Sequence, residues 1–389
     1  MQFVCKYANP IKIAYMQLLN NLSPAQFLAE YWQKKPLLIR GAMPDFKGLL
    51  NPNELAGLAC EENVQARIIQ QKKQNWTVKN GPFDDADFAK LPKKDWTLLV
   101  QSVNHYLPEA AELLTLFNFI PHARLDDLMV SYAPDGGGVG AHFDSYDVFL
   151  LQGSGRRNWK ISAQKDLTLL ENQPIKVLKN FNAEQEWTLE AGDMLYLPPH
   201  IAHWGVAIGD DCMTYSIGFR APKMHELQHE FLSYLQDNLN AEGLYEDADL
   251  TLQEHPAEIS ENMLKKVGEM LKEISWSKDN IADFLGKYLT EPKPDVCFEP
   301  HPGISIEVFA KELAHKILYL SLKSQLLFYD KMFYLNGEKL DVLEDITTAM
   351  RELSDKRSIA TGQYPRNLQD MLINVLYAPY LAGFVTFEL

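Results

Sequence analysis

Gly140-Ala141-His142-Phe143-Asp144 is the stretch of this 389-residue sequence that decides the fold. Side chains alternate along a strand, so His142 and Asp144 project from the same face. A second segment, Gly192-Asp193-Met194-Leu195-Tyr196-Leu197-Pro198-Pro199-His200-Ile201-Ala202-His203, supplies further imidazoles. Two imidazoles and one carboxylate on one side of a metal are a ligand set for non-haem Fe(II), which leaves coordination positions open. The two segments together predict a metal site.

The residues around both segments alternate between strand patterns and turn patterns. The expected strands are residues 128–134, 148–152, 156–162 and 194–197. We expect Gly136-Gly137-Gly138 and Gly153-Ser154-Gly155 to turn the chain, and Pro198-Pro199 to break it before His203 begins another strand. Ligands at the ends of short strands predict a small β-barrel with an open mouth.

Both segments, and the basic strand between them, resemble those of the JmjC (cupin-type) 2-oxoglutarate-dependent oxygenases. The closest resemblance is to bacterial ribosomal oxygenases that hydroxylate an arginine of a large-subunit ribosomal protein. Residues 31–41, 96–105, 126–131 and 215–222 carry the same resemblance. It runs from about residue 17 to the C-terminus and is most specific from residue 96 to 222. The first fifteen or so residues do not match and are expected to be either a tail or the product of an upstream start.

This resemblance implies an α+β fold in three parts. The first is a double-stranded β-helix, the jelly-roll or cupin barrel of JmjC proteins, in residues 1–222. A helical dimerisation region follows in residues 223–292, and a winged-helix-like domain in residues 293–389. The implied cofactors are Fe(II) and, as co-substrate, 2-oxoglutarate.

By the same resemblance, the catalytic iron ligands are His142, Asp144 and His203. His200 lies in the same segment and competes with His203 for this role. The family spacing of three residues between Pro-Pro and the ligand selects His203, so we expect His200 at the surface or behind the ligands.

2-Oxoglutarate needs a cation for its distal carboxylate, and Arg156 and Arg157 compete for that role. Alternation places Arg157 on the face of Trp159 and Ile161, which is the expected inner face. The planar guanidinium of Arg157 can hold a carboxylate through two hydrogen bonds. Ser216 is a second candidate contact to the co-substrate, with Thr214 on the same face; ordinary strand packing explains both equally well.

The substrate-binding candidates are acidic and aromatic, as a guanidinium substrate would require. Asp127 and Tyr146 are the first choices, and Tyr146 shares the parity of the metal ligands. Alternation leaves open whether Asp126 or Asp127 faces the pocket. Asp147 is expected to point away from the metal unless a bulge intervenes.

Composition and charge restrict the cellular setting and the partners. The net charge of −15 disfavours direct nucleic-acid binding and favours a basic partner such as a ribosomal protein, although solubility alone also explains an acidic surface. No apolar run approaches the length of a membrane span, and no signal peptide is recognisable. Four widely spaced cysteines favour a reducing compartment, so a cytoplasmic location is expected.

Beyond Met224 the pattern becomes helical. Leu227, Phe231, Leu235 and Leu239 recur every four residues, and a broader apolar stripe follows, made of Ile259, Met263, Leu264, Val267, Met270, Leu271 and Ile274. We expect this surface to form a homodimer. A proline-rich linker covers residues 291–303; beyond it we expect an Asn336-Gly337 hairpin and helices near 340–353 and 367–376.

The most consistent hypothesis is an Fe(II)- and 2-oxoglutarate-dependent protein hydroxylase that acts on an arginine of a ribosomal protein. One alternative is a JmjC hydroxylase or demethylase that acts on another residue or protein. Another is a non-catalytic metal-binding cupin in which the C-terminal domain recognises a partner. From Lys311 onward, nine Lys and Arg residues face ten Asp and Glu residues, so DNA binding by that domain is disfavoured.

Overall fold

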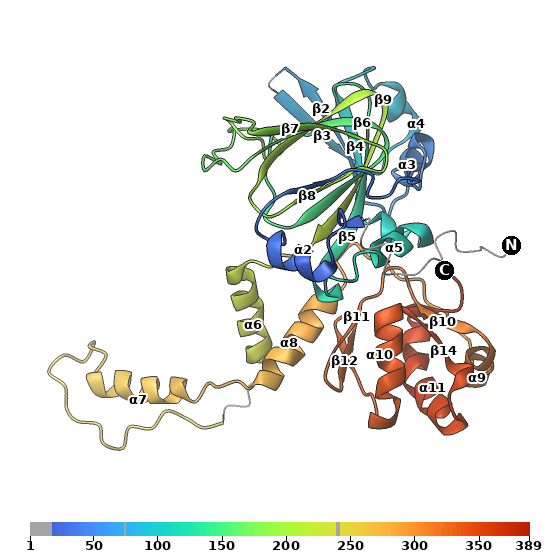
Figure 1. Cartoon of the computed structure of the whole chain (residues 1–389). Coiled ribbons are helices and arrows are strands. Elements are labelled where there is room, and N and C mark those ends of the chain that lie inside the picture. Colours follow the sequence, from blue (N-terminus) through green and yellow to red (C-terminus); the bar gives the residue numbers. More distant parts are fainter. Residues whose placement is uncertain (1–17, 74, 239–241) are drawn as a thin grey trace.

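A computed structural model describes residues 18–73, 75–238 and 242–389 of the chain. Figure 1 shows a β-barrel, a helical arm below it, and a second α+β unit formed by the C-terminal part. The predicted N-terminal tail and Leu239 lie outside the described residues. No helix of the described part is both long and apolar enough to cross a membrane.

The barrel is one antiparallel sheet with the strand order β1-β8-β6-β9-β5-β4-β2-β3, in which β7 also pairs with β6. The predicted α+β architecture with an antiparallel β-barrel is thereby confirmed. The strands are β1 (Leu37–Ile39), β2 (Ala66–Lys72), β3 (Asn75–Asn80), β4 (Trp96–Val100), β5 (Leu125–Ala133), β6 (Val148–Ser162), β7 (Gln185–Glu190), β8 (Met194–Leu197) and β9 (Ala202–Phe219).

The two faces of the barrel strands bury different side chains. On the outer face, Phe149 packs against Tyr196 and against Phe27 of α2, with ring centroids 4.9 and 5.5 Å apart. Leu150, the next residue, belongs to an inner cluster with Trp159. This period-two alternation is what commits each functional side chain to one face. The helices and short 3-10 turns of this part are α2 (Pro24–Glu30), α3 (Pro52–Leu58), α4 (Asp85–Ala89), η1 (Val103–His105), α5 (Pro108–Thr115) and η2 (His122–Arg124).

The expectation that Gly153-Ser154-Gly155 turns the chain is wrong. Strand β6 runs through this segment, and its pairing with β9 shifts register between Gln152, Ser154 and Arg156. Gly155 has φ +60°, and a Cβ there would lie 1.9 Å from the carbonyl oxygen of Asp211. The glycines therefore make a bulge in a continuous strand, because only they allow so close an approach to β9.

The helical arm contains α6 (Met224–Asn238), α7 (Glu261–Lys272) and α8 (Lys278–Thr290). Helices α6 and α8 pack together through Phe231 and Phe284, whose ring centroids are 5.2 Å apart. Helix α7 has no buried residue, and Leu264 and Leu271 are 54% and 61% exposed. Figure 1 shows α7 on an extended segment, away from the barrel and from the C-terminal unit.

The C-terminal unit combines two three-stranded sheets with three helices. Asn336 and Gly337 both have positive φ and form the predicted hairpin turn between β12 and β13. The helix expected from Leu340 begins at Thr347, because Leu340 pairs with Phe333 in the sheet. The elements are α9 (Ile306–His315), β10 (Ile317–Leu320), β11 (Leu326–Tyr329), β12 (Met332–Leu335), β13 (Glu338–Leu340), η3 (Glu344–Ile346), α10 (Thr347–Lys356), β14 (Ser358–Ala360), η4 (Thr361–Gln363), α11 (Arg366–Leu381) and β15 (Val385–Thr386).

The close packing of the bulge predicts that a side chain at position 155 destabilises the barrel. Gly155→Ala should lower the free energy of unfolding of the barrel by about 2 kcal/mol or more, because it adds a backbone clash to the strain of positive φ. Gly209→Ala is the matched control, since Gly209 has φ +81° but a Cβ there would meet nothing within 4 Å beyond its own chain neighbours. Urea unfolding should show a clearly smaller loss for the control; equal losses would mean that the bulge is not tightly packed.

Candidate metal centre and active site

Three predicted ligands meet at one end of the barrel. One ligand atom from each of His142, Asp144 and His203 lies within 4.8 Å of the other two. His203 Nε2 is 3.6 Å from a carboxylate oxygen of Asp144. The two histidines form a backbone bridge, in which the His142 amide donates to His203 over 2.9 Å and the His203 amide donates to His142 over 2.7 Å.

The imidazole rings are oriented for binding through Nε2. His142 Nδ1 lies 3.0 Å from the Gly140 carbonyl, and His203 Nδ1 lies 2.9 Å from the Ile201 carbonyl. A carbonyl partner requires a proton on Nδ1, which leaves the Nε2 lone pair free for a metal. Burial, and then the neighbouring His142, lower the pKa of His203 to about 4, so this imidazole is neutral near pH 7.

His200, the competing histidine, does not join this group. It is exposed, has φ +66°, and its amide donates to the Asp144 carbonyl over 2.7 Å. It therefore supports the backbone of Asp144 from outside the ligand triangle.

The two adjacent arginines of β6 have different environments. Arg157 is 4% exposed, whereas Arg156 is exposed to solvent. The Nε–H of Arg157 donates to the sulfur of Cys212 over 3.4 Å, but Nη2 is buried without a hydrogen-bond partner among the described residues. A buried guanidinium with an unused donor can bind an anion, so Arg157 fits the distal carboxylate of 2-oxoglutarate.

Several other side chains on the inner face are polar. The Thr214 hydroxyl donates to the side-chain oxygen of Gln152 over 3.2 Å, and the side-chain NH2 group of Gln152 donates to the sulfur of Cys212 over 3.4 Å. Ser216 is 8% exposed and pairs in register with Leu150. Thr214 thus has a partner inside the chain, whereas the Ser216 hydroxyl makes no hydrogen bond to another described residue.

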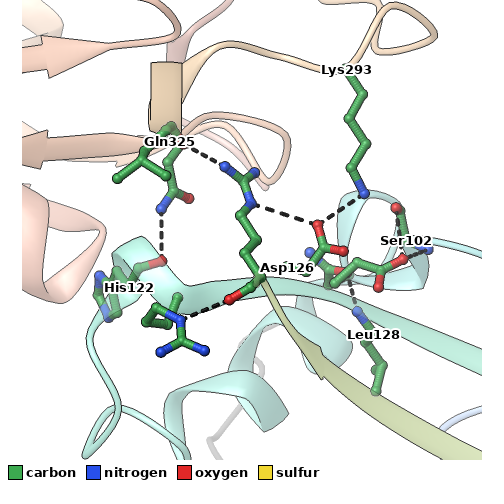
Figure 2. A network of polar contacts seen from close by, with 11 residues as sticks. Ser102, His122, Asp126, Leu128, Lys293 and Gln325 are labelled. Atoms are coloured by element: carbon green, nitrogen blue, oxygen red, sulfur yellow. Dashed lines mark hydrogen bonds and ion pairs between the residues drawn. The ribbon is translucent and has the colours of Figure 1, made fainter. Parts of the chain in front are cut away.

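Asp126 and Asp127 have separate partners. Figure 2 shows Asp126 facing Lys293, and it pairs with Lys293 Nζ over 3.0 Å and with Arg220 over 3.6 Å. Asp127 is 8% exposed and accepts hydrogen bonds from the Ser102 amide and hydroxyl over 2.9 and 3.1 Å. Burial, and then Asp126, raise the pKa of Asp127.

Tyr146 and Asp147 directly precede β6, and their side chains have different surroundings. Tyr146 is 42% exposed, and after burial the neighbouring Asp144 and Asp127 are the largest causes of its raised pKa. Asp147 is fully buried and accepts from Tyr196 over 2.6 Å and from Gln33 over 2.9 Å. Tyr146 is therefore at the opening next to the metal ligands, and Asp147 points away, as alternation predicts.

Comparison with known proteins places this geometry in a family. Residues 112–227 match the JmjC domain and residues 272–385 match the ROXA-like winged helix. Over 329 residues the chain is 33% identical to the ribosomal protein uL16 3-hydroxylase of Escherichia coli (strain K12), which covers 84% of this chain and 87% of that protein. This chain is a ribosomal oxygenase of the JmjC family.

Two further similar proteins support this family assignment. A probable ribosomal oxygenase of Haemophilus influenzae is 40% identical over 242 residues, which cover 61% of this chain and 57% of that protein. The structure of the Escherichia coli ribosomal oxygenase YcfD in complex with cobalt and 2-oxoglutarate has a TM-score of 0.82 at 31% identity, and the match covers 94% of this chain and 98% of that one. As a JmjC protein, this ribosomal oxygenase is a 2-oxoglutarate-dependent enzyme whose metal is Fe(II).

Four polar residues of this ribosomal oxygenase were missed by the sequence reasoning. Cys212 accepts from Arg157 and from Gln152. Ser102 and Asn104 hold the start of β5, where Asn104 accepts from the Leu128 amide over 2.9 Å. Gln152 carried a usable signal, because it shares the alternation of Val148 and Leu150. Ser102 carried none, since its left-handed backbone (φ 52°) is set by the turn before η1.

The metal assignment predicts a loss of binding that is specific to the three ligands. His142→Ala or Asp144→Ala should abolish both activity and metal binding while leaving the thermal unfolding midpoint nearly unchanged, because both side chains lie at the opening. Co(II) titration followed by visible absorption measures this directly. His200→Ala is the control and should still bind Co(II); undiminished metal binding in both ligand variants would contradict the assignment.

Proposed function

We propose that this ribosomal oxygenase hydroxylates a side chain of a ribosomal protein, and that the side chain is arginine. The observation that carries the proposal is the buried carboxylate of Asp127, whose charge, like that of the metal ligand Asp144, acts on Tyr146 at the opening. The relative named for hydroxylation of ribosomal protein uL16 supports the substrate class. Ribosomal proteins are basic, and this chain has a net charge of −15, which favours their encounter.

His142, Asp144 and His203 would hold Fe(II). When bound, Fe(II) and 2-oxoglutarate supply oxidative decarboxylation coupled to insertion of oxygen into a C–H bond. The chain supplies ligand geometry, a neutral imidazole at His203, and an inner barrel surface that excludes water around the co-substrate.

Arg157 would anchor the distal carboxylate of 2-oxoglutarate. Its Nε–H is held by Cys212, so the outer edge of the guanidinium, which includes the unpartnered Nη2, remains for a ligand. Ser216 is proposed as an additional hydroxyl contact to the co-substrate from β9.

Asp127 and Tyr146 would receive the substrate guanidinium. Ser102 directs both of its hydrogen bonds to one oxygen of Asp127, Oδ2, which leaves the other oxygen for a substrate. Gln101, the preceding residue, has a buried Oε1 with no hydrogen-bond partner among the described residues. These two acceptors match the donors of a planar guanidinium better than the single head of a lysine.

The exposed apolar face of α7 would pair with a second copy of the chain. Met263, Leu264, Met270 and Leu271 are 40–61% exposed along one side of a twelve-residue helix. A contiguous apolar surface of this kind marks an interface, and a two-fold contact is the commonest way to cover it.

The co-substrate role predicts different effects of the two neighbouring arginines. Arg157→Ala should raise the KM for 2-oxoglutarate at least about tenfold, because a charge-assisted contact is lost in a buried site. Arg156→Ala is the matched control and should change this KM little. Turnover of 2-oxoglutarate at varied concentration measures both; greater sensitivity at Arg156 would show that the inner face has been assigned wrongly.

The substrate role predicts a preference for arginine. A peptide from the ribosomal protein should gain one oxygen, and replacing its target arginine by lysine should lower kcat/KM about tenfold, because a point charge cannot use both acceptors. Mass spectrometry of the peptides measures the gain.

Asp127→Asn should raise the KM for the arginine peptide more than Asp126→Asn, which alters an ion pair outside the opening. Equal turnover of arginine and lysine peptides, or better turnover of histidine or asparagine peptides, would favour a different JmjC hydroxylase.

The assembly proposal predicts that one added charge separates the copies. Leu271→Glu should give a monomer in light scattering at micromolar concentration, because it places a charge in the apolar contact. Lys265→Glu, on the opposite side of α7, should leave the assembly unchanged. An unmodified protein that is already monomeric at this concentration would refute the proposal.

A further inference from the structure

A cavity of about 330 Å³, lined by charged, polar and apolar side chains, lies outside the metal site, between the barrel and the C-terminal unit. His105 and Asp126 line it from the barrel side, Lys293 from the linker, and Lys323 and Arg357 from the C-terminal unit. Figure 2 shows part of its wall, where Lys293 of the linker approaches Asp126 and Gln325 approaches His122. The cavity is thus built by parts of the chain that are far apart in sequence.

Positive side chains outnumber carboxylates around this cavity. Its lining includes five cations and three carboxylates, in a chain whose net charge is −15. Asp126 is shared by two of the cations, Arg220 and Lys293, and Glu291 and Asp355 are exposed. The five cations are Arg220, Lys293, Lys323, Lys356 and Arg357.

Lys323 and Arg357 have no carboxylate partner among the described residues. Lys323 Nζ donates to the Cys297 carbonyl over 2.8 Å. Arg357 Nη2 donates to the carbonyls of Ser321 and Ser324 over 2.9 and 3.0 Å. Carbonyl oxygens fix the direction of both side chains and leave their charges uncompensated, so both remain available to an anion.

The His105 ring lines the cavity, and nearby cations affect its pKa. Its ring has no hydrogen-bond partner among the described residues, although it lies beside the Tyr106 ring. Burial lowers the pKa of His105 to about 4, and Lys293, Arg357 and Lys323 contribute to this lowering, against a smaller opposite effect of Asp295. Three cations from two parts of the chain therefore add to the effect of burial in disfavouring a positive charge on this ring.

We propose that this cavity is a binding site for a small tetrahedral oxyanion, either inorganic phosphate or the phosphate group of a monoester. Lys323 and Arg357 would supply two positive charges for the anion, Lys293 would supply a third positive charge, and the His105 ring would donate a directional hydrogen bond. A phosphate fits this chemistry better than chloride, because its several oxygens can accept from donors on different walls. The proposal is independent of the hydroxylation reaction.

The test uses His105 as a reporter in the full-length protein. Titration with inorganic phosphate, at ionic strength held constant with sodium chloride, is followed by the imidazole resonances in NMR and by calorimetry. An anion in the cavity favours the protonated ring, so saturating phosphate should raise the pKa of His105 from about 4. Reciprocally, phosphate should bind more tightly as the pH falls toward that value.

Variants identify the location of binding. Lys323→Met should weaken phosphate binding about tenfold, since one charge-assisted contact is removed. His105→Gln keeps a donor and should bind with little change, but without the pH dependence. Lys331→Met is the control, because Lys331 pairs with Glu344 on the C-terminal unit and does not line the cavity.

Each outcome decides the proposal. Adenosine monophosphate in place of phosphate distinguishes the two sources: tighter binding assigns a monoester, and weaker binding assigns the free ion. No change of the His105 resonances, an equal response to chloride alone, or an equal loss in Lys331→Met would overturn the site and show an adventitious ion only. Enzymatic activity is not the readout, so a failure here leaves the hydroxylase proposal untouched.

Discussion

The reciprocal backbone hydrogen bonds between His142 and His203 are the interaction on which the active site depends. They join two segments that are far apart in the sequence, and they fix the distance between two ligands before any metal binds. The continuous pairing of β6 with β9 extends this bridge into the barrel, where Ile161 is opposite His203. A ligand set on one rigid sheet edge costs little reorganisation on metal binding, because the protein has already ordered the donors.

The orientation of Arg157 depends on the same strand pair. Val148, Leu150 and Gln152 face inward at even positions, whereas Arg157, Trp159 and Ile161 face inward at odd positions. The bulge at Gly153–Gly155 changes the phase between these two sets. Alternation of strand faces counted forward from His142 and Asp144 would place Arg156 on the inner face. Alternation counted back from Trp159 places Arg157 there. The structure buries Arg157 and leaves Arg156 exposed, and the register of β6 with β9 explains this difference.

The features of this ribosomal oxygenase that the sequence predicts depend on local spacing, whereas the features that it does not predict depend on contacts between distant residues. His142, Asp144, the strand faces and the Asn336-Gly337 turn follow from local spacing, and all are where the sequence places them. The separate roles of Asp126 and Asp127 do not, because β5 changes register with β9 between Leu125 and Leu128. The partners of the two carboxylates, Lys293 and Ser102, come from distant turns. Long-range contacts of this kind leave no periodic signal in one sequence.

Adjacent carboxylates on β5 connect the two polar regions of the molecule. Asp127, which we propose to bind the substrate, is buried, while Asp126 forms an ion pair in the wall of the inter-unit cavity. Burial, and then the charge of Asp126, raise the pKa of Asp127, and Lys293 opposes this rise. The linker cation therefore stabilises the charged form of the residue proposed to receive the substrate. The position of the linker therefore has an electrostatic effect on the carboxylate that we propose to bind the substrate.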